Sequence, residues 1–119
     1  MKNKANKRQR MVFQKLNQES KLIISFKKDA VSVDLVGSVL LKTGMIEDIL
    51  YVKESPHHFH VDWSKLTKVL YDNDNQYNEG CLTFMDDKTV IFKVFKTYGD
   101  FNVEIMKLFK CNASFELIC

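Results

Sequence analysis

The chain has 119 residues, 45% of them hydrophobic and 12% aromatic, which suits one packed domain. No apolar run approaches the roughly 20 residues that span a bilayer, and the basic start lacks the apolar segment of a secretion signal. Cys81, Cys111 and Cys119 have no CxxC or CxxH spacing, which argues against a disulfide framework or a zinc knuckle. We therefore expect a protein without a transmembrane segment, located in the cytoplasm or the nucleus.

The net charge of +3 is unevenly distributed along the chain. Residues 1–15 carry six cations and no acid, which leaves 12 cations against 15 acids in the rest. We therefore expect residues 1–10 to form a basic, disordered tail before a domain over residues 11–110, with residues 111–119 an extension of unknown role. The tail could associate non-specifically with nucleic acid, or it could be a solvated terminus or a localisation signal.

The first half of the chain predicts an ordered lead-in followed by β-strands. Apolar positions within 11–16 suit a short helix or a lead-in segment. Residues 22–26 and 31–36 are rich in β-branched side chains and predict strands, and residues 38–42 predict another. Residues 45–52 fit either a strand or a short helical turn. Ser55-Pro56 marks a break, because proline lacks an amide donor and restricts the residue before it.

Residues 57–63, HHFHVDW, contain every histidine and the only tryptophan of the chain. Apolar and polar side chains alternate here, which predicts a half-buried strand. The apolar set would face the core and the polar set the solvent: Phe59, Val61 and Trp63 against His58, His60 and Asp62. The polar face is either an exposed surface or a zinc site. In the second interpretation His58 and His60 chelate the metal and Asp62 is a third ligand or orients a histidine.

The second half predicts a strand at residues 66–71, a polar loop over 71–80, a hairpin and a helix. Residues 81–85 and 89–95 flank Asp86-Asp87-Lys88, a pattern typical of a tight hairpin. Asp100 is a suitable N-cap for an amphipathic helix whose apolar stripe contains Phe101, Ile105, Leu108 and Phe109. The order predicts a mainly β, α+β fold of about seven antiparallel strands and one C-terminal helix.

Four segments resemble the pleckstrin-homology-like (PH-like) superfold, in particular its GRAM and BEACH-associated members. They are DLVGSVLL (34–41), FHVDWSKLTKV (59–69), GCLTFMDDKTVIFKVF (80–95) and YGDFNVEIMKLF (98–109). The resemblance implies an antiparallel barrel or sandwich closed by the helix, with a small OB- or Sm-like barrel as the alternative. The helix lacks the tryptophan that many members of the superfold carry there.

This resemblance implies a non-enzymatic binding module, most directly an adaptor or scaffolding domain for protein–protein interaction. Its contacts would involve the polar loop, with Tyr71 and Tyr77. The alternative is phosphoinositide binding at the membrane surface through Lys21, Lys27, Lys28 and Lys42. The residues themselves contain no nucleophile–base pattern, and adjacent acids such as Glu47-Asp48 are typical of solvated turns. We therefore expect no enzymatic activity and no cofactor.

Overall fold

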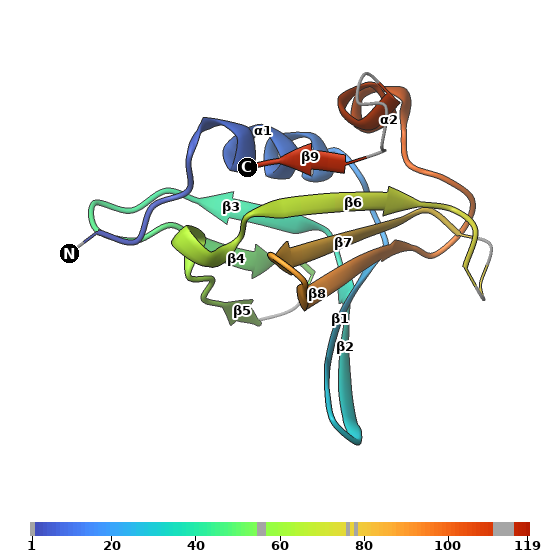
Figure 1. Ribbon diagram of the computed structural model, residues 1–119, viewed down its shortest axis with the longest axis horizontal. Coiled ribbons are helices and arrows are strands. Elements are labelled where there is room, and N and C mark those ends of the chain that lie inside the picture. The colour runs from blue at the N-terminus through green and yellow to red at the C-terminus, as the bar shows by residue number, and fades with distance from the viewer. Residues whose placement is uncertain (1, 55–56, 76, 78, 111–115) are drawn as a thin grey trace.

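The computed structural model describes residues 2–54, 57–75, 77, 79–110 and 116–119 (Figure 1). The elements in chain order are α1 (Lys7–Leu16), β1 (Leu22–Lys28), β2 (Val31–Gly37), β3 (Val39–Lys42), β4 (Ile49–Val52), β5 (His58–Phe59), the 3-10 helix η1 (Trp63–Lys65), β6 (Lys68–Asp72), β7 (Cys81–Asp86), β8 (Thr89–Lys96), α2 (Val103–Lys110) and β9 (Glu116–Ile118). The predicted mainly β, α+β class is confirmed.

The strands form two antiparallel sheets that make a sandwich and not a closed barrel. The six-stranded sheet has the order β2-β1-β8-β7-β6-β9, and the three-stranded sheet has the order β3-β4-β5. The first strand pairs with the eighth, with Leu22 opposite Lys96. The sequence did not predict this strand order, because a pairing so distant in the chain leaves no local pattern. Figure 1 shows the β1–β2 hairpin extending beyond the other strands.

Helix α1 begins earlier than the sequence predicted, at Lys7 instead of near Met11. A capping box starts it: the Asn6 side chain accepts a hydrogen bond from the Gln9 amide at 2.9 Å, and the Gln9 side chain accepts one from the Asn6 amide at 2.8 Å. No glycine or proline interrupts the helix. Its apolar face, with Val12, Phe13 and Leu16, is buried in the core.

The residues before α1 are held in place and do not form the expected tail. The Asp48 carboxylate accepts a hydrogen bond from the Ala5 amide at 2.9 Å and pairs with the Lys4 ammonium at 2.7 Å. The Asn3 side chain donates to the Val61 carbonyl at 2.7 Å and accepts from the Trp63 amide at 3.1 Å. Residues 3–5 therefore contact both the loop before β4 and the segment after β5.

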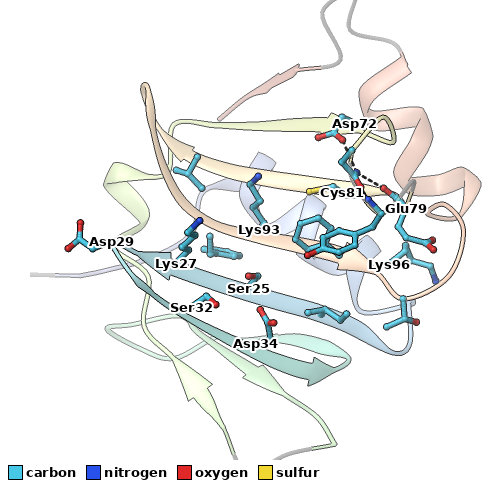
Figure 2. Close-up of a pocket in the computed structure, with 17 residues that line it drawn as sticks. Ser25, Lys27, Asp29, Ser32, Asp34, Asp72, Glu79, Cys81, Lys93 and Lys96 are labelled. Atoms are coloured by element: carbon cyan, nitrogen blue, oxygen red, sulfur yellow. Dashed lines mark hydrogen bonds between the residues drawn. The ribbon is translucent and has the colours of Figure 1, made fainter.

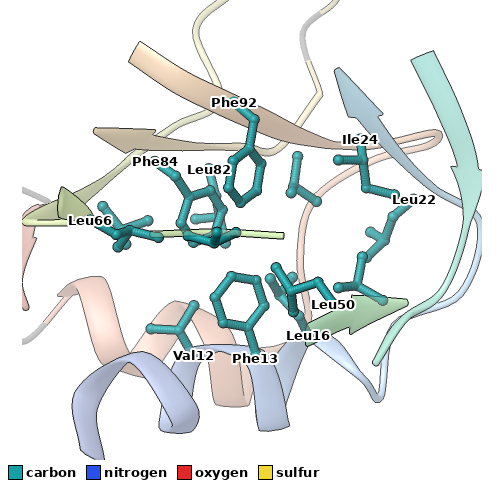
Figure 3. Close-up of a cluster of buried hydrophobic side chains, with 14 of the residues drawn as sticks. Val12, Phe13, Leu16, Leu22, Ile24, Leu50, Leu66, Leu82, Phe84 and Phe92 are labelled. Carbon is teal, nitrogen blue, oxygen red and sulfur yellow. The ribbon is translucent and has the colours of Figure 1, made fainter. Parts of the chain in front are cut away.

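Aromatic rings form the centre of the core between α1 and the six-stranded sheet (Figure 3). Phe84 stacks on Phe92 with ring centroids 4.5 Å apart, and Phe13 of α1 stacks on the other side of Phe84 at 5.1 Å. Trp63 meets Phe13 edge-on at 5.6 Å, and its indole N–H donates to the Asp48 carbonyl at 2.9 Å. The apolar set predicted for the HHFHVDW segment thus contributes to the core, although β5 spans only His58–Phe59.

The predicted hairpin and C-terminal helix are both present. Strands β7 and β8 pair across a two-residue turn, with Asp86 opposite Thr89. Asp100 was the expected N-cap of α2, but Asn102 occupies that position: its side-chain oxygen accepts from the Glu104 and Ile105 amides at 3.0 and 3.1 Å. Within the described ranges, no helix is long and apolar enough to cross a membrane.

Candidate functional site

A groove lies on the face of the six-stranded sheet that points away from the aromatic core. Along β1, Leu22 and Ile24 face the core, so the alternating residues face the other way. We call this cavity the outer groove; it has a volume of about 1090 Å³ and is lined on its strands by Ile23, Ser25, Lys27, Lys93 and Phe95, and by Tyr77 from the β6–β7 loop. Figure 2 shows Ser25, Lys27 and Lys93 on the groove side of β1 and β8.

One end of the outer groove is aromatic. Tyr77 is 60% exposed, and its ring meets Phe95 of β8 edge-on with centroids 5.6 Å apart. Near Tyr77, the side-chain amide of Asn75 donates to Asp72 at 2.9 Å and to the Glu79 carbonyl at 2.7 Å. The Tyr77 phenol therefore lines the groove and is accessible to a ligand.

The other part of the groove carries two lysines and two aspartates. Ser25 of β1 is directly opposite Lys93 of β8, and Lys27 lies one side-chain repeat further along the same face of β1. Among the described residues neither Lys27 nor Lys93 forms an ion pair, whereas Lys96 pairs with Glu19 at 2.8 Å. Asp29 and Asp34 also line this part and balance the charge of the two lysines. The two free ammonium groups can still bind a carboxylate that enters between the strands.

Cys81 lies at the floor of the outer groove and is 1% exposed. Burial raises the pKa of its thiol to about 11, and a weak contact with the Thr83 hydroxyl, at 3.8 Å, and the charge of Lys93 oppose that effect only in part. The group is therefore a protonated thiol at neutral pH. A nucleophile or soft metal ligand needs the thiolate, so Cys81 is a structural residue here.

The predicted metal ligands only partly come together. The rings of His58 and His60 have centroids 5.4 Å apart, and the Nδ1 atom of His60 is 3.0 Å from Glu47 Oε2. Asp62 instead caps η1, where it accepts hydrogen bonds from the Ser64 amide and hydroxyl at 3.2 and 2.6 Å. Over the part of the chain that the structure describes, no group of three or more His, Cys, Asp or Glu side chains is arranged for a metal ion.

Glu47 is in contact with His60 of this histidine pair. Hydrogen bonds from His60 and from the Asn3 side chain, the latter at 3.1 Å, lower the pKa of its carboxyl group despite some desolvation. On the other side of the pair, the Tyr51 ring is 5.4 Å from His58, and the Lys42 ammonium lies 4.7 Å above Tyr51.

The residues predicted for lipid binding do not form one site. Lys21 and Lys28 lie at opposite ends of β1, roughly 20 Å apart at the rise of an extended strand. Lys27 lines the outer groove, and Lys42 stacks on Tyr51 of the other sheet. A single headgroup cannot contact all four. The basic residues near the N-terminus are also used within the fold, as with Arg8, which donates to the Ile118 carbonyl at 2.7 Å.

Of the two tyrosines predicted to contact a partner protein, one points inward. Tyr71 is 9% exposed, and its hydroxyl donates to Asp100 at 2.6 Å. Burial and the Asp100 carboxylate raise the pKa of this phenol above its ordinary value. Only Tyr77 is accessible, in the outer groove. The sequence prediction missed Lys93 and Phe95, although their alternation with core residues in VIFKVFK placed them on the outer face.

Comparison with known proteins identifies the fold. No protein-family profile matches the chain, and no curated protein matches it in sequence. Among solved structures, the heme-binding protein ChuX is similar with a TM-score of 0.61 and 9% sequence identity, over 85% of this chain and 67% of that one.

This similarity overturns the sequence-based assignment to the PH-like superfold, its GRAM and BEACH-associated members included. The predictions that depended on that assignment are wrong with it: the adaptor domain for protein partners and the phosphoinositide site. The prediction of nucleic-acid association through the N-terminal residues is likewise not supported. At 9% identity the likeness establishes that this chain is folded like ChuX, and it establishes the fold alone.

Proposed function

We propose that this protein binds heme in the outer groove, as a non-enzymatic carrier or store. Heme is a flat apolar ring with carboxylate side chains at one edge and an iron that takes an axial protein ligand. A site for it must therefore combine apolar surface, cationic side chains that pair with the carboxylates, and one ligating side chain. The outer groove offers these three features on a single face of the sheet.

The observation that carries the proposal is the position of Tyr77 relative to Lys27 and Lys93, which form no ion pair among the described residues. Its phenol is 60% exposed at the aromatic end, and Lys27 and Lys93 stand further along the same groove. Tyrosine is an established axial ligand of heme iron, and ammonium groups pair with carboxylates. Two features support this assignment: the volume of about 1090 Å³ is at the upper end for small-molecule pockets, and the fold is that of a protein that binds heme.

The described residues that line the groove have the side-chain types that heme binding requires. Phe95 and Ile23 would contact the ring, Tyr77 would hold the iron, and Lys27 with Lys93 would hold the carboxylates. Bound heme would supply an iron centre to whatever partner or reaction uses it. The chain's own residues would supply binding and orientation, and the thiol in the lining, Cys81, is protonated at neutral pH.

Titration of the purified chain with heme, followed by absorbance, tests the proposal. We expect one heme per chain, with a spectrum of phenolate-ligated ferric iron. Tyr77→Phe should remove that spectrum and weaken binding about tenfold or more, which corresponds to about 1.4 kcal/mol. Tyr98→Phe is the matched control, because Tyr98 is 87% exposed and lies outside the groove. Equal losses in both variants, or no saturable binding, would refute the site.

The lysines are tested by a charge-matched pair of double variants. Lys27→Gln with Lys93→Gln should weaken heme binding about 2- to 30-fold, from about 0.2–1 kcal/mol for each exposed ion pair. The control combines Lys53→Gln with Lys88→Gln, two exposed positions outside the groove. An equal effect of the control would show that heme responds to net charge and not to the groove.

A further inference from the structure

A pair of histidines on the second sheet lies close enough for both rings to bind one metal ion. His58 belongs to β5 and His60 follows two residues later; both side chains are exposed to solvent. Their ring centroids are 5.4 Å apart. Two imidazole nitrogens at about 2.0–2.1 Å from one tetrahedral zinc ion place the ring centroids roughly 5 Å apart, so both rings can reach one ion with little movement.

The contact with Glu47 selects which nitrogen of His60 is available. Glu47 Oε2 lies 3.0 Å from His60 Nδ1, and as a carboxylate it can only accept, so Nδ1 carries the proton. The Nε2 atom then keeps a free lone pair for a metal. A carboxylate bonded to the second nitrogen of a ligating histidine is the usual outer partner in zinc sites, where it fixes the ring and raises its basicity.

The position of Glu47 is itself fixed by the N-terminal segment. The Asn3 side chain donates to Glu47 Oε2 at 3.1 Å and to the Val61 carbonyl at 2.7 Å. Val61 follows His60 directly, so one side chain holds both the carboxylate and the backbone beside the histidine. This arrangement orients His60 before any metal arrives.

We propose that His58 and His60 form a two-histidine site for a divalent transition metal that prefers imidazole, such as Zn²⁺, with Glu47 as a positioning residue. Water or an external ligand completes the coordination, because Asp62 caps η1 and the described part of the chain offers no third ligand to the pair. The Lys42 ammonium above Tyr51 adds positive charge on one side, which limits the affinity. The site lies on the other sheet from the outer groove and does not depend on heme binding.

Calorimetric titration with ZnCl₂ tests this inference on the heme-free full chain, prepared without a polyhistidine tag. We expect one Zn²⁺ per chain, and His58→Gln and His60→Gln should each weaken binding at least about tenfold. His57→Gln is the matched control and should bind as the wild type does, because His57 is exposed in the same run without being part of the pair. Circular dichroism of each variant checks that the fold is retained.

A second measurement tests whether Glu47 acts by orienting the His60 ring or only through its negative charge. Glu47→Gln should weaken Zn²⁺ binding severalfold, and imidazole ¹⁵N spectra should show His60 losing its single fixed tautomer. The inference is overturned if zinc binding does not saturate by about 100 μM, a concentration far above the dissociation constants of structural zinc sites. It is also overturned if His57→Gln loses as much affinity as the other two variants. Heme affinity should be unchanged in all of them, so the two proposals fail separately.

Discussion

The carboxylate of Asp48 is fully buried and accepts a hydrogen bond from the backbone amide of Ala5 at 2.9 Å. Burial alone would raise its pKa, but hydrogen bonds from the Lys4 ammonium and from the Ala5 and Gly44 amides outweigh that effect and lower it. One side chain therefore joins the segment before α1 to the loop before β4, and it does so in its charged form.

Asp48→Asn should destabilise the protein by about 1–3 kcal/mol at pH 7, because it leaves buried donors poorly satisfied. Since the folded-state pKa is lowered, the stabilisation by Asp48 is present above the unfolded-state pKa and is lost as the pH falls through the folded-state value. Urea unfolding of both proteins at pH 7 and near pH 3 measures this. A difference in stability that stays the same at both pH values would contradict it.

Asn6→Ala should cost about 1 kcal/mol of stability, because it removes the side-chain oxygen that caps α1. Asn6→Asp is the control: it keeps an acceptor at the N-cap and adds a negative charge where the helix dipole favours one. Thermal unfolding of both variants distinguishes the loss of the cap from a general intolerance of change at residue 6. An equal loss of stability in both variants would contradict a stabilising role of the Asn6 cap.

Phe84→Ala should destabilise the protein by about 3–5 kcal/mol, since it leaves a cavity between Phe13 and Phe92 at the centre of the core. Tyr98→Ala provides the comparison, because Tyr98 is exposed and should change stability by no more than about 0.5 kcal/mol. Chemical denaturation gives both values. A small loss for Phe84→Ala would mean that helix α1 can close over the gap.

Cys81 should react with thiol reagents about a hundredfold more slowly than an ordinary cysteine, since its pKa is raised from 9.0 to about 11 and the thiolate is the reacting form. A chain with Cys111→Ser and Cys119→Ser isolates this thiol. Its rate at pH 8, compared with the rate of the same chain unfolded in urea, measures the protection. Equal rates in the two states would contradict the buried, protonated thiol.

The features that the sequence predicted correctly are those encoded locally. The β7–β8 hairpin follows from a short turn at Asp87 between alternating segments, and Val61 and Trp63 are buried as their spacing indicated. The order of the strands could not be predicted in this way, because β1 finds its second neighbour at β8, far along the chain. Helix α1 was partly missed because its first turn is basic and resembled a tail, although Asn6 and Gln9 have capping-box spacing.

The candidate site was only partly predictable for the same physical reason. Lys27 and Tyr77 were selected from the sequence for other roles, and the outer groove brings them together with Lys93 from a third segment. The groove exists only because β1 and β8 are adjacent in the sheet. His58 and His60 were recognised from their alternation alone, whereas the Glu47 partner depends on the loop before β4.

The pairing of β1 with β8 also affects how the chain folds. Leu22 and Ile24 are fully buried in the finished sheet, but β1 acquires its inner neighbour only when residues 89–96 are in place. Until then, the first hairpin carries apolar side chains and an open strand edge that can pair with another chain. Pairing between strands so far apart in the chain favours slow folding. While the strand edge is open, the chain can aggregate, so the yield of refolded protein should fall as the protein concentration rises. Expression yield should therefore depend on how quickly β8 reaches β1 and less on the stability of the finished domain.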